Sequence, residues 1–144
     1  MEHEGVIEGG APGSHRLEIL LVDDNPADVR LTVEALHDSG IDHRLTVARD
    51  GVEAMALLRG PLNPRPDIVL LDLNLPVKDG REVLEEIKAD PALRRIPVAV
   101  LTSSQAEEDV LRSYDLHANG YLIKPVEPEK VVGLLRGVDP ASTP

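Results

Sequence analysis

The chain has 144 residues and a formal net charge of −11, with 42% hydrophobic residues and no cysteine, phenylalanine or tryptophan. This length predicts one domain with an aliphatic core. The negative charge argues against nucleic acid or an anionic membrane as a partner, because both are negative themselves. The absence of cysteine excludes disulfides and thiolate catalysis, and no apolar run approaches the roughly 20 residues of a membrane span. We therefore expect a cytoplasmic protein that binds neither nucleic acid nor membrane.

The chain divides into one domain and two short tails. Residues 1–16 contain four glycines and a proline with little to bury, which predicts a flexible N-terminal tail. The folded domain is expected over residues 17–137, followed by a short C-terminal tail at 138–144. No second domain fits after residue 137, so we expect a single folded domain.

Five short apolar runs alternate with longer segments whose apolar residues recur at helical spacing. The expected strands are residues 17–22, 44–48, 67–72, 97–102 and 120–124. The expected helices are residues 26–38, 50–60, 79–90, 105–118 and 127–137. The runs 67–72 and 97–102 are apolar almost throughout, as in strands that are covered on both faces. This alternation predicts a (βα)5 fold of the α/β class, with a doubly wound parallel five-stranded sheet.

Charged and hydroxyl side chains follow the predicted strands. Asp23 and Asp24 follow the first strand, while Asp72, Thr102 and Lys124 end the third, fourth and fifth. The carboxyl ends of parallel strands share one edge of the sheet, where ligands bind. With Ser103 directly after Thr102, the topology therefore predicts that three carboxylates, two hydroxyls and an ammonium gather at one edge.

Three carboxylates this close favour a bound cation. Each close pair repels by roughly 4 kcal/mol at an effective dielectric constant near 20. An all-oxygen set of Asp24, Asp72 and a main-chain carbonyl near Asn74 suits Mg²⁺, with Asp23 acting through a bound water. Open positions on such an ion, next to Lys124, favour a phosphoryl group as the ligand.

Four segments carry a family resemblance: VDDN (22–25), LLDLNLPVKDG (70–80), VLTSS (100–104) and YLIKP (121–125). In order and spacing they resemble the receiver domain of two-component response regulators, across about residues 17–137. The resemblance implies a flavodoxin-like sheet with strand order 2-1-3-4-5, numbered along the chain. The segments ADPALRRIPVAVLTSS and HANGYLIKPV are similar to single-domain regulators that serve phytochrome-type histidine kinases.

The resemblance also implies residue roles. Asp72 would accept the phosphoryl group, and Thr102 and Lys124 would bind its oxygens. Thr102 and Tyr121 would be the switch residues, with Tyr121 as the switch aromatic. The peptide bond between Lys124 and Pro125 would be cis. The implied Mg²⁺ ligands are Asp23, Asp24, Asp72 and Asn74.

The function expected from these roles is that of a stand-alone response regulator. It would take a phosphoryl group from the phosphohistidine of a sensor histidine kinase onto Asp72 and change its affinity for a downstream protein. It would catalyse only its own phosphorylation and dephosphorylation, so it would not be an enzyme with a separate substrate. The alternative is a non-phosphorylated, receiver-like adaptor, and a homodimer is left open.

The first predicted helix has two apolar stripes, and a two-layer fold buries mainly one of them. One stripe is Ala27, Leu31 and Ala35, and the other is Val29, Val33 and Leu36. The stripe left over, with the loop at 125–128, is the candidate docking surface for the kinase. The residues predicted for it are Pro26, Val29, Val33, Pro125 and Val126.

Two other functions are weighed against this one. A haloacid-dehalogenase-type phosphatase needs a second aspartate two residues after the first, where this chain has Asn74. A flavodoxin-like cofactor binder needs a phosphate-cradling loop and aromatic walls, and the sequence offers neither. Both are therefore less favoured than the adaptor.

Overall fold

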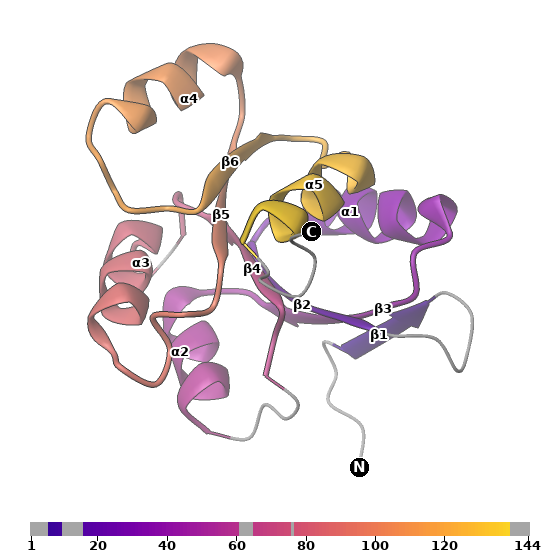
Figure 1. Cartoon of the computed structure of the whole chain (residues 1–144), viewed down its shortest axis with the longest axis horizontal. Helices are drawn as coiled ribbons and strands as arrows, with labels where there is room; N and C mark the ends of the chain where they lie inside the picture. Colours follow the sequence, from indigo (N-terminus) through magenta and orange to yellow (C-terminus); the bar gives the residue numbers. More distant parts are fainter. Residues whose placement is uncertain (1–5, 10–15, 61–64, 76, 139–144) are drawn as a thin grey trace.

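The computed structural model describes residues 6–9, 16–60, 65–75 and 77–138. A central sheet lies between two layers of helices: α1 and α5 lie together on one side, and α2 and α3 on the other (Figure 1). The strands are β1 (Val6–Gly9), β2 (Leu17–Val22), β3 (His43–Ala48), β4 (Ile68–Asp72), β5 (Val98–Thr102) and β6 (Gly120–Ile123). The helices are α1 (Pro26–Ser39), α2 (Gly51–Arg59), α3 (Gly80–Ala89), α4 (Gln105–Arg112) and α5 (Pro128–Val138).

The sheet order is β1-β3-β2-β4-β5-β6, and the strands from β3 to β6 in this order are parallel. Numbered without β1, these five strands have the order 2-1-3-4-5. The predicted fold class and strand order are therefore confirmed. The carboxyl ends of β2, β4 and β5 meet at one edge, since Val22 pairs with Leu71 and Asp72 with Leu101.

The sheet has one strand more than predicted. Val6–Gly9, expected to be part of a flexible tail, form β1, which pairs antiparallel with β3 from Val6 opposite Thr46 to Gly9 opposite His43. Without β1 the outer edge of β3 would have unpaired backbone groups, which β1 instead hydrogen-bonds. The prediction of a flexible tail over residues 1–16 is therefore wrong at this segment. Its other parts, 1–5 and 10–15, and the predicted tail residues 139–144 lie outside the described residues, while Val138 ends α5.

Alternate residues of each central strand enter two separate cores. In β2, Leu20 and Val22 pack on the side of α2 and α3, whereas Ile19 and Leu21 pack on the side of α1 and α5. All residues of β4 and β5 are buried. The prediction of strands covered on both faces is confirmed. This burial fixes the position of each strand in the sheet, and with it the point at which the strand ends.

The helix α4 is shorter than predicted. It ends at Arg112, whereas the sequence pattern extends the helix to residue 118. Asp115 and His117 have φ values of 49° and 61°, in the left-handed region that a right-handed helix cannot contain. Leu111 is the buried residue of α4, and the helix lies at the margin of the fold in Figure 1.

Among the described residues, no helix has the length and apolar character required to cross a membrane.

Candidate functional site

Three carboxylates meet at the carboxyl edge of the sheet. Asp23 and Asp24 directly follow β2, and Asp72 ends β4. One oxygen of each lies within 4.8 Å of one oxygen of the others. Asp23 and Asp72 are 1% and 6% exposed, whereas Asp24 is exposed. The predicted gathering of these three acids is therefore found, and Asp24 opens the group to solvent.

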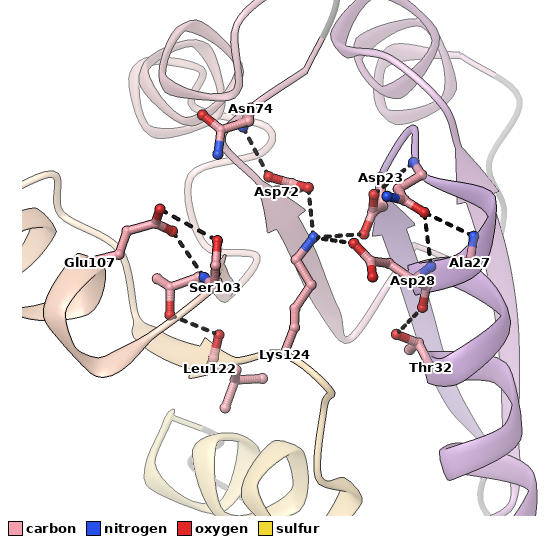
Figure 2. Close-up of polar contacts among 12 residues, drawn as sticks. Asp23, Ala27, Asp28, Thr32, Asp72, Asn74, Ser103, Glu107, Leu122 and Lys124 are labelled. Carbon is pink, nitrogen blue, oxygen red and sulfur yellow. Dashed lines mark hydrogen bonds and ion pairs between the residues drawn. The ribbon is translucent and has the colours of Figure 1, made fainter.

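The backbone that leaves each strand orients the two buried carboxylates. The Asn25 N–H donates to Asp23 Oδ1 and the Asn74 N–H donates to Asp72 Oδ1, both at 2.9 Å. In each case an aspartate accepts from the residue two positions later, a local turn typical of this side chain. The other oxygen of each carboxylate faces Lys124 (Figure 2).

Lys124 follows β6 and reaches across the strand ends. Its ammonium lies 2.9 Å from Asp72 Oδ2, 3.3 Å from Asp23 Oδ2 and 2.8 Å from Asp28 Oδ2 (Figure 2). The Lys124 N–H donates to the Thr102 carbonyl at 2.8 Å, which ties the start of this loop to the end of β5. The peptide bond between Lys124 and Pro125 is cis, as predicted.

The site has an excess of negative charge. The site contains four carboxylates, those of Asp23, Asp24, Asp28 and Asp72, and one ammonium, so its formal charge is −3. Burial, more than the charge of Asp72, raises the pKa of Asp23, although the hydrogen bond from Asn25 and the charge of Lys124 act against it. For Lys124, burial lowers the pKa, but hydrogen bonds to Asp28 and Asp72 outweigh it and raise the pKa above the usual lysine value. The ammonium is therefore held in its charged form.

The donor set fits a hard divalent cation. It consists only of oxygens, and neither a histidine nor another softer ligand joins the cluster found among the described residues. Oxygen ligands suit Mg²⁺ and Mn²⁺. The exposed Asp24 leaves the cluster open to solvent, and the main-chain carbonyl of Asn74 follows Asp72 at the same edge.

A glycine brings α3 close to the end of β4. A Cβ atom at Gly80 would lie 2.5 Å from the main-chain oxygen of Asp72 and 2.5 Å from Leu73 Cα. The Gly80 N–H donates to the Leu73 carbonyl at 3.1 Å. No larger residue fits here without moving the backbone of Asp72, so Gly80 helps to fix the position of this carboxylate.

The hydroxyl side of the site lies at the end of β5. Thr102 is fully buried, and its Oγ1 is 3.5 Å from the Leu122 carbonyl oxygen. The next residue, Ser103, donates its N–H to Glu107 Oε1 at 3.0 Å (Figure 2). The first turn of α4 is therefore tied to the loop that follows Thr102.

Tyr121 lies apart from the carboxylates. Its ring is half-buried, and the Arg112 guanidinium of α4 lies 4.7 Å from the ring centre. Burial raises the pKa of its hydroxyl. Arg112 also pairs with Glu108 at 2.8 Å. Tyr121 thus contacts α4 rather than the strand-end acids.

The predicted docking residues are only partly accessible. Pro26 and Pro125 are exposed, but Val126 is 2% exposed, and Val29 and Val33 pack against the core on the α1 side. Val29 and Val33 are half-buried on the side of α1 that packs toward the sheet, so their role in docking stays a prediction. In the other stripe Ala27 and Leu31 are exposed and Ala35 is half-buried.

Sequence reasoning missed Asp28, whose carboxylate bonds to Lys124. Its one signal is its place four residues after Asp24, in the first turn of a helix. An acid in that turn is common because it complements the helix dipole, so the sequence does not distinguish the two roles.

Comparisons with known proteins agree with this geometry. Residues 19–136 match the family model described as "Response regulator receiver domain". The response regulator Rcp1 of Synechocystis sp. is 52% identical over 125 residues, covering 84% of this chain and 85% of its own.

Two similar solved structures are a phosphorylated form and a metal-bound form. The phosphorylated cyanobacterial phytochrome response regulator RcpA has a TM-score of 0.68 and 50% identity, covering 87% of this chain and 92% of its own. The Mn²⁺-bound form of Rcp1 has a TM-score of 0.67 and 48% identity, covering 89% and 99%.

Proposed function

Because this chain belongs to the response regulator receiver family, we propose that it accepts a phosphoryl group on Asp72 from the phosphohistidine of a histidine kinase. The observation that carries the proposal is the cluster at the strand ends. A buried aspartate lies 2.9 Å from a charged lysine and within 4.8 Å of two further carboxylates. The phosphorylated form of RcpA, a similar protein, supports the same chemistry here.

In the proposed reaction a carboxylate oxygen of Asp72 attacks the phosphorus atom. A new O–P bond forms and the P–N bond breaks, and the leaving nitrogen keeps the electron pair of that bond, so that an imidazole protonated on its other nitrogen leaves as the neutral ring. Lys124 lies where its ammonium can offset charge that develops on the phosphoryl oxygens. The buried Thr102 hydroxyl is the second proposed phosphoryl contact.

We propose Mg²⁺ as the cofactor, held by Asp23, Asp24, Asp72 and the Asn74 carbonyl. When bound, the ion supplies positive charge that offsets the repulsion among carboxylates and phosphoryl oxygens. The all-oxygen donor set and the Mn²⁺-bound form of the similar Rcp1 support this assignment.

The proposed output is a change at the α4 side of the domain. An acyl phosphate on Asp72 adds between about one and two negative charges next to Thr102, whose hydroxyl can donate to it. Movement of Thr102 would give Tyr121 room to turn inward, away from Arg112, and so change the surface that a downstream protein contacts.

The kinase is proposed to dock at a groove of about 480 Å³ between α1 and the loop after β6. Leu31, Ala35, Pro125 and Lys130 are among its lining residues, and Lys124 connects it to the carboxylates. A phytochrome-type histidine kinase is the proposed partner, because RcpA, a phytochrome response regulator, is similar to this chain. The proposal includes a cytoplasmic location, which the absence of cysteine favours.

The proposal is tested by incubation with acetyl phosphate, with and without Mg²⁺, followed by intact mass. Wild type should gain about 80 Da, the mass of one phosphoryl group, only when Mg²⁺ is present, and Asp72→Asn should gain nothing. Asp38→Asn, at an exposed residue of α1, is the matched control and should behave as wild type. A gain that persists in Asp72→Asn would refute the acceptor, and no gain in wild type would favour the non-phosphorylated adaptor.

A further inference from the structure

Three carboxylates surround the Lys124 ammonium, but they differ in what else they can bind. The ammonium has three N–H donors, and it lies 2.8 Å from Asp28, 2.9 Å from Asp72 and 3.3 Å from Asp23. Asp23 and Asp72 also belong to the cluster that could hold a cation, and Asp28 does not. The shortest of the three contacts is therefore the one outside the cation cluster.

The start of α1 holds Asp28 in place. Asn25 caps the helix, and its side-chain oxygen accepts from the Asp28 N–H at 3.2 Å. The Thr32 hydroxyl donates to the Asp28 carbonyl at 3.1 Å (Figure 2). The Asp28 carboxylate thus projects toward Lys124 from a rigid helical turn, only five residues after Asp23.

There is room for the ammonium to move on this side. Asp28, Thr32, Lys124 and Pro125 line a cavity of about 130 Å³ between α1 and the loop after β6. The side chains of Asp28 and Lys124 are 29% and 18% exposed, so water screens their pairing only in part.

A divalent cation and the ammonium would compete for the same two carboxylates, those of Asp23 and Asp72. A cation that enters takes part of the charge of these two carboxylates, which weakens their hold on Lys124. The contact with Asp28 is unaffected by this competition, so it can retain the ammonium beside Asp72.

We infer that Asp28 is a positioning residue of this site: it holds the Lys124 ammonium beside Asp72 while a divalent cation takes over Asp23 and Asp72. The cation can then enter without expelling the lysine. The inference rests on the proposed function for its role in phosphotransfer, but the competition itself can be measured without any phosphodonor.

The test is a double-mutant cycle on Mg²⁺ affinity, measured by isothermal titration calorimetry. The variants are Asp28→Asn, Lys124→Met and the double variant, with Glu34→Gln as the control. Glu34 lies exposed on α1, and its substitution changes the net charge by the same amount as Asp28→Asn. Asp28→Ala and Lys124→Gln serve as second variants if a first one does not give the wild-type circular dichroism spectrum.

In the wild-type background, Asp28→Asn should raise the Kd for Mg²⁺ by about three- to tenfold, because the ammonium then competes harder for Asp23 and Asp72. Lys124→Met should lower the Kd. In the Lys124→Met background, Asp28→Asn should change the Kd less than about twofold. An equal effect of Asp28→Asn in both backgrounds, or an equal effect of Glu34→Gln, would overturn the inference, since Asp28 would then act as a remote charge or a helix residue.

Phosphorylation by acetyl phosphate at saturating Mg²⁺ separates this inference from the proposed function. If wild type gains a phosphoryl group and Asp28→Asn gains it about three- to tenfold more slowly, the positioning of Lys124 extends to phosphotransfer. If wild type gains none while the cycle keeps its coupling, the proposed function fails and the positioning of Lys124 stands. If wild type is phosphorylated and the cycle shows no coupling, the inference alone fails.

Discussion

The buried carboxylate of Asp23 makes the metal-free site costly to fold. At an effective dielectric constant near 20, two of the carboxylate charges, which lie within 4.8 Å of each other, repel by at least about 3.5 kcal/mol. Lys124, at 3.3 Å, attracts Asp23 by about 5 kcal/mol. The combined repulsion of Asp23 by Asp72 and by the exposed, partly screened Asp24 is similar in size to this attraction. Charge–charge terms therefore nearly cancel, and burial decides the balance against the charged form of Asp23, as its raised pKa also indicates.

We therefore expect Asp23→Asn to raise the free energy of unfolding at pH 7 in EDTA by about 1–2 kcal/mol. The amide keeps an acceptor for the Asn25 N–H, and Lys124 keeps Asp28 and Asp72 as partners, so no buried charge is left unpaired. In saturating Mg²⁺ this advantage should shrink or reverse, because the cation stabilises wild type more than the variant.

Urea unfolding, followed by far-ultraviolet circular dichroism, measures this difference. The exposed Asp38→Asn serves as the control and should change stability by less than about 0.5 kcal/mol. Because the pKa of Asp23 is raised in the folded state, the destabilisation by its charge is complete above that folded pKa and is lost as the pH falls toward the ordinary value of 3.8. The two proteins should therefore converge at low pH. A variant less stable than wild type in EDTA, or a difference independent of pH, would refute this reasoning.

Three further predictions follow from the packing. Leu31→Ala should slow phosphotransfer from a phosphorylated phytochrome-type histidine kinase by about tenfold, but it should not slow phosphorylation by acetyl phosphate. The control Val52→Ala, at a similarly exposed valine of α2, should change neither rate. Equal effects of the two substitutions would exclude the groove as the docking site of the kinase. In urea unfolding, Gly80→Ala should destabilise the fold by about 1–3 kcal/mol. Gly133→Ala, where α5 has open space, should stabilise the fold by about 0.5–1 kcal/mol. A Gly80→Ala variant as stable as wild type would contradict the close approach of α3 to the end of β4. Deletion of residues 1–10 should speed hydrogen exchange of β3 amides that face β1, and unchanged exchange would contradict the β1–β3 pairing.

The sequence predicts the parallel sheet well because its signal is local. Strands buried on both faces read as continuous apolar runs, and the residues that follow them must meet at one edge. Asp23, Asp24, Asp72 and Lys124 could therefore be placed together from the strand ends alone. Their contacts in the structure match that expectation.

The features that the sequence does not predict depend on tertiary contacts. The strand β1 is a four-residue run within a glycine-rich segment, and it forms because β3 offers an open edge. The left-handed backbone at Asp115 and His117, which follows the early end of α4, has no glycine to mark it. The two stripes of α1 have similar apolar character, so helical periodicity alone does not say which one faces the sheet.

Asp28 has two roles, one at the start of a helix and one as a partner of Lys124, and the first makes the second hard to predict from the sequence. In sequence it is an ordinary first-turn acid, which a helix N-terminus favours on its own. In the fold the same turn begins shortly after Asp23 and Asp24, so a side chain at its third position reaches the ammonium of Lys124, which follows β6. The short link between β2 and α1 therefore does more than connect the two elements. It places the Asp28 carboxylate, which lies outside the cation cluster, opposite Lys124, which also contacts two members of that cluster. Because Asp28 is not needed by the cation, a cation and an ammonium can occupy one acidic site together.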